Sequence, residues 1–509
     1  MFEHRLCTSS SSRVIPFGDS FSCFDFIEKE FGEDYPSIHR CFSLARSFES
    51  KTLVFEELSP CGEGIIYDEN TELKTRYPNY SSKRLCRLSF WTKEFISLDD
   101  LEPSDEDFLI GYAIVKNDFI PSLKNDYHVF EAVFKKYSHK HNYIRKMPRF
   151  RVRVGKYFFY ASGAMYAQQN GVSKCCAHVA LYTVLANNLT EKEPSFSTMT
   201  RIVNGLSKQE LGLNPDEIRK ILDYYGIKYH DISYEPTSPS SKDTVPFNKL
   251  IYAGIESGGG ALIGFQLSNG DGHIIPFFGH TFNKDTWVSE ADLFYFKTGL
   301  IEYSPSENWT SSFIGHDDNF GPNLCVPKLY LNSNQVSYVI EVLRPGVTFS
   351  GAKAEIIAYQ QFYYILRFIS ETSASSDVNR WTRRVKNVFE CHRVVLRTIS
   401  LKKEDYLEHI RSIKDGDNHI EQKKILDILA DYLPSFLWLT EFSLPQLFPA
   451  NERKVGEIII DATQKPDDNN SQELFLAARF PQYWFFPSSE NGAFLGVPSA
   501  FSSHTPNFC

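Results

Sequence analysis

Two apolar runs separated by a short turn constrain the fold of this 509-residue chain more than any other feature. The first run is GGGALIGFQLS, the second is HIIPFFGHTF, and Asn269-Gly270-Asp271-Gly272 lies between them. Asn-Gly and Asp-Gly pairs favour the tight turns of β-hairpins. The two runs are therefore predicted to pair as antiparallel strands, which excludes an all-helical fold.

Helical patterns lie on both sides of this hairpin. Asn214 is a candidate N-cap with Pro215 at the first helical position, and Gly226 ends the predicted helix. A second helix is predicted over CAHVALYTVLANNL, and a strand over IKYHDISYE. Helical periodicity returns later in the chain at 353–370, 378–398 and 422–432, followed by the strand-like runs FLWLTEFS, GEIIIDA, ELFLAARF and YWFF. The fold class is therefore predicted to be α+β.

Three regions that differ in composition and in predicted secondary structure suggest a domain organisation. Residues 1–150 are mixed and rich in aromatic side chains, and residues 151–345 alternate between helix-like and strand-like segments. Residues 346–509 are first helical and then strand-like. We therefore predict a central domain at 151–345 with N-terminal and C-terminal flanking regions whose roles the sequence does not indicate.

Composition excludes several classes of function. With 54 Lys+Arg against 63 Asp+Glu, the formal charge is −9, so no overall positive field is present to bind nucleic acid. No apolar run reaches the ~20 residues needed for a membrane span, and the N-terminus lacks a secretory apolar segment. The ten cysteines include no CxxC, so neither a disulfide framework nor a zinc ribbon is expected, and a cytoplasmic location is predicted.

The stretch AMYAQQNGVSKCCAHVALYTVL contains the candidate nucleophile. A thiol in the first turn of a helix meets unpaired backbone N–H groups and the positive end of the helix dipole, and both favour the thiolate. Cys175 and Cys176 are both candidates, and we favour Cys176 because a helix that begins there aligns it with an apolar stripe. Gln169, or alternatively Gln168, can provide an amide that stabilises an oxyanion beside the thiol.

A base and a residue that orients it are predicted from DGHIIPFFGHTFNKDTW. His273 begins the second strand of the hairpin, and Asp285 comes twelve residues later, just before Thr286-Trp287. A thiol nucleophile needs a base, and the base needs a partner on its other ring nitrogen. His280 is the rival base and Asn283 the rival orienting residue.

This combination resembles the papain-like cysteine peptidase superfamily, in which a Gln precedes a Cys at the start of the central helix. In that family a His on a later strand and an Asn or Asp before a Trp complete the site. The matching positions here are Gln169, Cys175 or Cys176, His273 and Asp285. The spacing from His273 to Gly279 is closer to the bacteriocin-leader-processing (double-glycine) peptidases. The resemblance covers residues 168–287.

The resemblance implies a papain-like core in which the Cys-bearing helix packs on an antiparallel sheet. It also implies hydrolysis of a peptide or isopeptide bond of a protein or peptide substrate through a thioester, without a metal or organic cofactor. Two other functions remain open from the residues alone. The same site could catalyse acyl transfer or deamidation, or the core could be a non-catalytic protein-binding module. The sequence leaves the substrate and the oligomeric state open.

Overall fold

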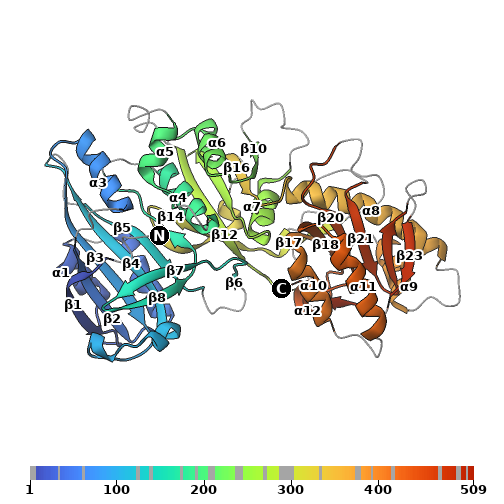
Figure 1. Ribbon diagram of the computed structural model, residues 1–509, viewed down its shortest axis with the longest axis horizontal. Coiled ribbons are helices and arrows are strands. Elements are labelled where there is room, and N and C mark those ends of the chain that lie inside the picture. The colour runs from blue at the N-terminus through green and yellow to red at the C-terminus, as the bar shows by residue number, and fades with distance from the viewer. Residues whose placement is uncertain are drawn as a thin grey trace. The chain divides into compact units, whose positions relative to one another are not determined.

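The three-dimensional structure is a computed structural model of the whole chain (Figure 1). The residues that it describes are 7–32, 35–59, 64–121, 126–136, 142–171, 176–189, 193–203, 212–234, 245–266, 272–285, 303–331, 335–372, 380–390, 394–413, 419–467, 473–488, 494–499 and 503–508.

The chain forms two compact units, each built from separate stretches of sequence. The first unit comprises Met1–Ile227, Leu262–Gly279 and Phe313–Tyr338. The second comprises Lys228–Ala261, His280–Ser312 and Val339–Cys509. These units differ from the predicted divisions at residues 150 and 345, and residues 1–150 belong to the same unit as the Cys-bearing helix.

Long-range contacts explain why residues 1–150 do not form a domain of their own. The short strand β9 (Met165–Tyr166) pairs with β5 (Asp126–Phe134), and the Tyr166 hydroxyl donates to Ser37 Oγ at 3.0 Å. The Arg40 guanidinium donates to the carbonyl oxygens of Pro322 at 3.0 Å and Asn323 at 2.5 Å. Composition changes along the chain contain no information about such pairings.

An antiparallel sheet dominates the N-terminal part of the first unit (Figure 1). Its strands, in spatial order, are β1 (Ser9–Pro16), β2 (Thr52–Leu58), β3 (Ser81–Trp91), β4 (Leu109–Phe119), β5 and β9. Helices α1 (Cys23–Phe31) and α2 (Pro36–Ser47) bury apolar side chains against one face of this sheet. Helix α3 (Ile65–Arg76) and the two-stranded sheet of β7 (Arg149–Val154) and β8 (Tyr157–Ser162) complete this part.

The predicted hairpin lies in a second sheet. The order there is β10 (Tyr229–Ser233), β16 (Val336–Val342), β11 (Ala261–Gln266), β12 (Gly272–Thr281), β14 (Ser312–Asp317) and β15 (Gly321–Pro327), with β6 (Asn142–Tyr143) also paired to β12. Strands β11 and β12 are neighbours, and the chain between them is too short for a parallel crossover. The predicted pairing of these two runs is confirmed.

Among its described residues, the central region forms the α-helices α4 (Cys176–Asn188), α5 (Phe196–Ile202), α6 (Pro215–Tyr224) and α7 (Phe247–Glu256). The predicted cap of α6 is confirmed. The Asn214 side chain accepts from the Glu217 N–H at 3.0 Å, and the Glu217 carboxylate accepts from the Asn214 N–H at 3.1 Å. Gly226 adopts φ +70°, a left-handed conformation that glycine tolerates at a helix end.

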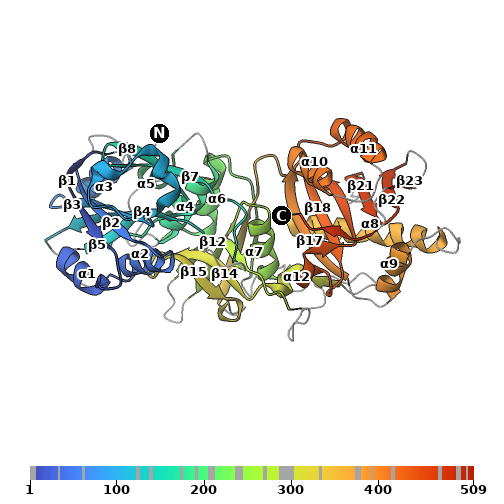
Figure 2. The same ribbon diagram turned by 90° about the horizontal axis from the view of Figure 1, so that it is seen from below.

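The C-terminal part of the second unit is a sheet with helices on both faces (Figure 2). The strand order is β13 (Tyr303–Pro305), β17 (Val394–Lys402), β18 (Phe436–Ser443), β20 (Gly456–Asp461), β21 (Phe475–Phe480), β22 (Tyr483–Pro487) and β23 (Phe494–Pro498). Trp438 packs with α8 (Gly351–Thr372) on one face, whereas Leu437 and Leu439 pack with α10 (Lys403–Ser412) and α11 (His419–Tyr432) on the other. Alternate residues of one strand therefore contribute to two separate cores.

The mixture of helices and largely antiparallel sheets confirms the predicted α+β class. One predicted helix, 378–398, is wrong in its second half. Helix α9 (Arg380–Glu390) ends, and Val394 begins β17, which pairs with both β13 and β18. Pairing on both edges overrides the helical periodicity of this segment. No helix in the described part of the chain is long and apolar enough to cross a membrane.

Cys7 is disulfide-bonded. The other described cysteines, Cys23, Cys41, Cys86, Cys176 and Cys325, are free thiols, so the partner of Cys7 lies outside the described residues.

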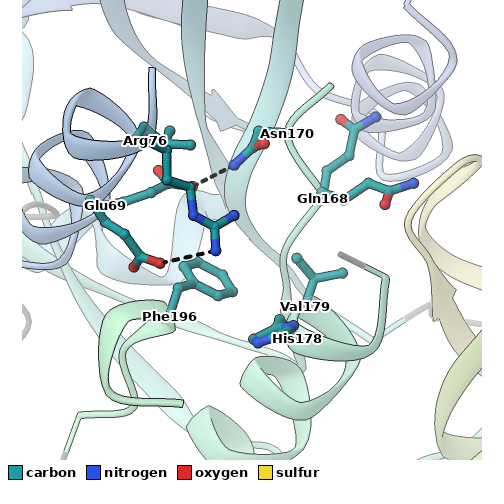
Figure 3. A pocket seen from close by; sticks show the side chains of 10 residues that line it. Glu69, Arg76, Gln168, Asn170, His178, Val179 and Phe196 are labelled. Atoms are coloured by element: carbon teal, nitrogen blue, oxygen red, sulfur yellow. Dashed lines mark hydrogen bonds and ion pairs between the residues drawn. The ribbon is translucent and has the colours of Figure 1, made fainter. Parts of the chain in front are cut away.

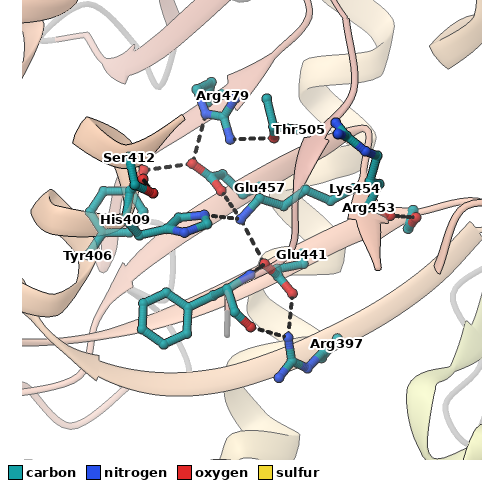
Figure 4. Close-up of polar contacts among 12 residues, drawn as sticks. Arg397, Tyr406, His409, Ser412, Glu441, Arg453, Lys454, Glu457, Arg479 and Thr505 are labelled. Atoms are coloured by element: carbon teal, nitrogen blue, oxygen red, sulfur yellow. Dashed lines mark hydrogen bonds and ion pairs between the residues drawn. The ribbon is translucent and has the colours of Figure 1, made fainter. Parts of the chain in front are cut away.

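A network of buried charges lies within the C-terminal sheet (Figure 4). Lys454 Nζ, on β19 (Arg453–Lys454), lies 2.7 Å from Glu441 Oε1 and 2.6 Å from Glu457 Oε2. Arg397 pairs with Glu441 at 3.0 Å, and Arg479 pairs with Glu457 at 2.9 Å. The two cations beside Glu457 hold the pKa of its carboxyl well below the usual range, although burial opposes this shift.

Removing the central cation should destabilise the second unit strongly. We expect Lys454→Met to lower the free energy of unfolding by about 3–5 kcal/mol, because it leaves two buried carboxylates without their shared partner. Denaturant-induced unfolding measures the change. Lys284→Met is the matched control, since its pair with Glu452 is exposed and should contribute less than about 1 kcal/mol. Equal losses in the two variants would contradict this account of the network.

Candidate active site

Helix α4 positions the candidate nucleophile in the first unit. Ten consecutive residues of this helix, 177–186, are buried, so α4 is a central helix and not a surface one. It packs against β9 and α5. Cys176, the first described residue of α4, is a half-buried free thiol. Cys175, the rival nucleophile, lies outside the described residues.

His273 lies near the start of β12 and hydrogen-bonds to the Cys176 thiol. Its Nε2 atom lies 3.0 Å from Asp317 Oδ2 and 3.8 Å from Asp318 Oδ1. Asp317 ends β14, the strand next to β12, so the sheet itself brings the imidazole and the carboxylate together. A thiol, an imidazole and a carboxylate are thus joined in one chain of hydrogen bonds.

The turn after β14 fixes the Asp317 carboxylate. Its Oδ1 atom accepts from the backbone N–H groups of Asn319 at 2.8 Å and Phe320 at 3.3 Å. This Asx turn occupies one oxygen and directs the other, Oδ2, at His273. The sequence IGHDDNFGP therefore forms a turn, and the same turn holds the carboxylate that contacts the candidate base.

The neighbouring carboxylates determine the charge of the imidazole. Burial alone lowers the pKa of His273, but the hydrogen bonds with Asp317 and Cys176 and the charge of Asp318 together raise it to about 10. Burial, supported by the nearby Asp317 charge, raises the pKa of Asp318 to about 6. At neutral pH the His273 ring is therefore an imidazolium.

Tyr338 is a further neighbour of the thiol, which sequence reasoning did not identify. Burial raises the pKa of the Tyr338 phenol, and the charge of Cys176 adds to this effect. Its ring lies against Gly264 of β11, where an added Cβ would come within 2.3 Å of Tyr338 Cε1. A glycine is therefore required at position 264 for the tyrosine to occupy this place beside the site.

Asp285 is not placed as predicted, and its assignment as the orienting residue is corrected to Asp317. The Asp285 side chain is exposed, and its backbone N–H donates to Asn283 Oδ1 at 2.9 Å, which is a local Asx turn. Asn283 is also exposed and caps this turn, so it is not the partner of His273 either. Proximity to Thr286-Trp287 in the sequence suggested the wrong carboxylate.

His280, the rival base, belongs to a different environment in the second unit. Its Nε2 atom lies 2.9 Å from Glu256 Oε1, and its Nδ1 atom lies 3.0 Å from the Thr281 carbonyl oxygen. The ring is 1% exposed and lies against Tyr252. Both ring nitrogens are thus engaged in a buried network, and the structure favours His273 as the base.

The two glutamines have different positions. Gln168 pairs with β5, because its side-chain Oε1 accepts from the Val129 N–H at 2.8 Å and its own N–H donates to the Val129 carbonyl at 3.0 Å. Gln169 is half-buried and lines a pocket together with His178 and Val179 of α4. The pairing of Gln168 leaves Gln169 as the better candidate for stabilising an oxyanion.

His273, Asp317 and Asp318 are also the one group among the described residues that could hold a metal ion, with ligand atoms within 4.8 Å of one another. Nitrogen and carboxylate oxygen ligands suit several divalent cations. In the structure His273 Nε2 hydrogen-bonds to Asp317 Oδ2 at 3.0 Å, and Asp318 Oδ1 lies 3.8 Å from the same nitrogen.

The two residues that sequence reasoning did not assign, Asp317 and Asp318, lie in the polar run at the end of β14. Their signal was a dense group of polar side chains at a strand end, a common location of site residues.

Comparisons of the chain with models of protein families, with curated proteins and with solved structures give no match.

Proposed function

We propose that the protein is a papain-like cysteine peptidase that hydrolyses a peptide or isopeptide bond. One observation carries the proposal: the His273 ring hydrogen-bonds to the Cys176 thiol and lies 3.0 Å from Asp317. A nucleophile, a base and an orienting group in series are the parts that thiol-based acyl transfer requires. A buried structural cysteine has no need of this arrangement.

The geometry supports a two-step reaction. In the resting site the proton of the thiol is held on His273, and the Cys176 thiolate attacks the substrate carbonyl carbon. The Gln169 amide and the Cys176 backbone N–H are proposed to stabilise the resulting oxyanion. His273 then donates its proton to the leaving amine, and a thioester forms on Cys176. Water, deprotonated by His273, cleaves the thioester and releases the acid.

A thiol-directed epoxide tests this proposal without knowledge of the substrate. At pH 6.5 a thiolate held by an imidazolium should react about 100 times faster than an ordinary thiol, of which about 1% is ionised. We expect peptide mapping to find the epoxide on Cys176, and His273→Ala to remove most of this advantage. Cys325, an exposed free thiol, is the internal reference. Equal labelling of the two cysteines would contradict the proposal and favour a non-catalytic protein-binding module.

The same site chemistry permits acyl transfer or deamidation, because water and an amine differ only in their access to the thioester. The mass of the product distinguishes these reactions. Hydrolysis of a peptide bond yields two fragments, deamidation adds about one mass unit to the substrate, and transfer yields the mass of the joined product.

A further inference from the structure

A pocket lies beside the N-terminal part of α4, where His178 and Val179 contribute to its lining (Figure 3). It lies in the first unit and is walled by α3, the segment after β9, the start of α4 and the start of α5. Val179 lies three residues after Cys176 and so on the same side of α4, and Gln169, the proposed oxyanion residue, belongs to the same lining. These two residues connect the pocket with the proposed site.

Two polar groups of the lining lack a hydrogen-bond partner among the described residues. His178 is only 1% exposed, and both of its ring nitrogens are buried without a hydrogen-bond partner among the described residues. Gln169 Oε1 is likewise buried and unpartnered. Burial, together with the nearby Arg76 charge, lowers the pKa of His178 to about 4. The ring is therefore neutral at pH 7 and offers one N–H donor and one acceptor nitrogen.

The acidic residues of the lining already have cationic partners. Glu69 accepts from Lys116 Nζ at 2.5 Å and from Asn170 Nδ2 at 2.9 Å. Glu72 lies 3.9 Å from the Arg76 guanidinium, one turn further along α3. The pocket thus has little uncompensated charge, and an ionic group would enter it without a free counter-charge.

We infer that this pocket is a subsite for a carboxamide side chain, so that the preferred substrates are peptides with glutamine or asparagine near the scissile bond. A carboxamide oxygen would accept from the His178 N–H, and its NH₂ group would donate to Gln169 Oε1. The Phe196 ring and Val179 form the apolar part of the pocket, against which the methylene groups of such a side chain pack. The inference rests on the proposed peptidase function for its meaning as a substrate subsite.

Other side chains fit the pocket less well. An aliphatic side chain would bury His178 and Gln169 without hydrogen bonds, which costs the full desolvation of both groups. A glutamate has the right length, but its charge would meet a neutral imidazole and the oxygen of an amide, and the Arg76 guanidinium of the lining is already paired with Glu72. A site that presents hydrogen-bond donors and acceptors to its ligand discriminates strongly against a ligand of the same shape that lacks the matching groups.

Binding to the Cys176→Ala variant tests the inference independently of turnover. The probes are peptide mixtures in which one position at a time holds Gln, Asn, Glu or norleucine and the remaining positions are randomised. At one position we expect Gln or Asn to bind at least about tenfold more tightly than norleucine and Glu. In the same background, His178→Phe should reduce this preference to within about twofold, because it keeps a ring and removes both nitrogens.

Thr183→Val is the matched control, since Thr183 is also a buried polar residue of α4 but does not line the pocket. It should retain the carboxamide preference. If peptides bind without this preference, or if none bind, the inference is overturned. If the preference is present but the wild-type protein cleaves none of the preferred peptides, the subsite stands and the proposed peptidase function fails. If His178→Phe retains the preference, the pocket is not its source.

Discussion

Replacing Cys176 with alanine is expected to abolish peptide hydrolysis and to leave the fold intact. The side chain is half-buried and its thiol hydrogen-bonds to His273, so the replacement removes the nucleophile and creates little empty volume. Loss of a nucleophile in such sites lowers kcat by a factor on the order of 10⁴–10⁶. The measurement is single-turnover cleavage of a mixed peptide library, with circular dichroism to check the fold.

Two other cysteines serve as controls for this experiment. Cys325→Ala removes an exposed free thiol and should leave activity within about twofold of the wild type. Cys175→Ala tests the alternative that the sequence leaves open. If Cys175→Ala is inactive and Cys176→Ala is active, the nucleophile is the other cysteine of the pair. Full activity of the Cys175/Cys176 double variant would exclude thiol catalysis.

Local signals make half of the candidate site predictable. Cys176 lies at the beginning of an apolar helical pattern, and His273 lies next to a hairpin turn, so each position can be predicted from its immediate neighbours in the sequence. The hydrogen bond between them depends on how α4 and β12 pack, which the family resemblance suggests and residue patterns alone do not determine. The structure brings this pair together.

The carboxylate cannot be predicted in the same way. The sequence favours Asp285 because it lies twelve residues after His273 and precedes Trp287. Asp317 lies 44 residues after His273 in the sequence and reaches it only because β14 is the strand next to β12. Strand order is a non-local property, and no periodicity in the chain encodes it.

The elements of the fold show the same difference between features that are determined locally and features that depend on distant residues. The Asn214 capping box and the strand run FLWLTEFS are predictable, because a cap and a short apolar run are determined within a few residues. The two compact units are not, since each combines three separate stretches of the chain. The segment after Glu390 has a helical pattern and yet forms β17, because it has partners on both edges.

Among residues that do not contact the substrate, we expect Asp317 to have the largest effect on activity when it is replaced, in the variant Asp317→Asn. The variant keeps the shape of the side chain and removes the charge that, with the Cys176 hydrogen bond, raises the pKa of His273 from 6.5 to about 10. We expect kcat/KM at pH 8 to fall by about 10²–10⁴-fold, the range seen when a base loses its orienting carboxylate.

The pH dependence distinguishes this role from a purely structural one. In the wild type His273 stays protonated up to about pH 10, so its ion pair with Asp317 and the contribution of that pair to stability persist through neutral pH and are lost as the pH rises through 10. In Asp317→Asn the pKa of the His273 ring should fall towards 6.5, so the loss of activity should be smallest below pH 6.5 and grow up to pH 10.

Two other carboxylates serve as controls. Asp318→Asn, whose Oδ1 atom is 3.8 Å from His273 Nε2, should show a smaller shift of the His273 pKa with the same sign. Asp285→Asn, exposed in its own turn, should match the wild type at every pH. If Asp285→Asn were the most impaired of the three variants, Asp285 and not Asp317 would be the orienting residue. If all three kept the wild-type pH profile, no carboxylate would control the charge of His273, and the proposed relay would lose its third member.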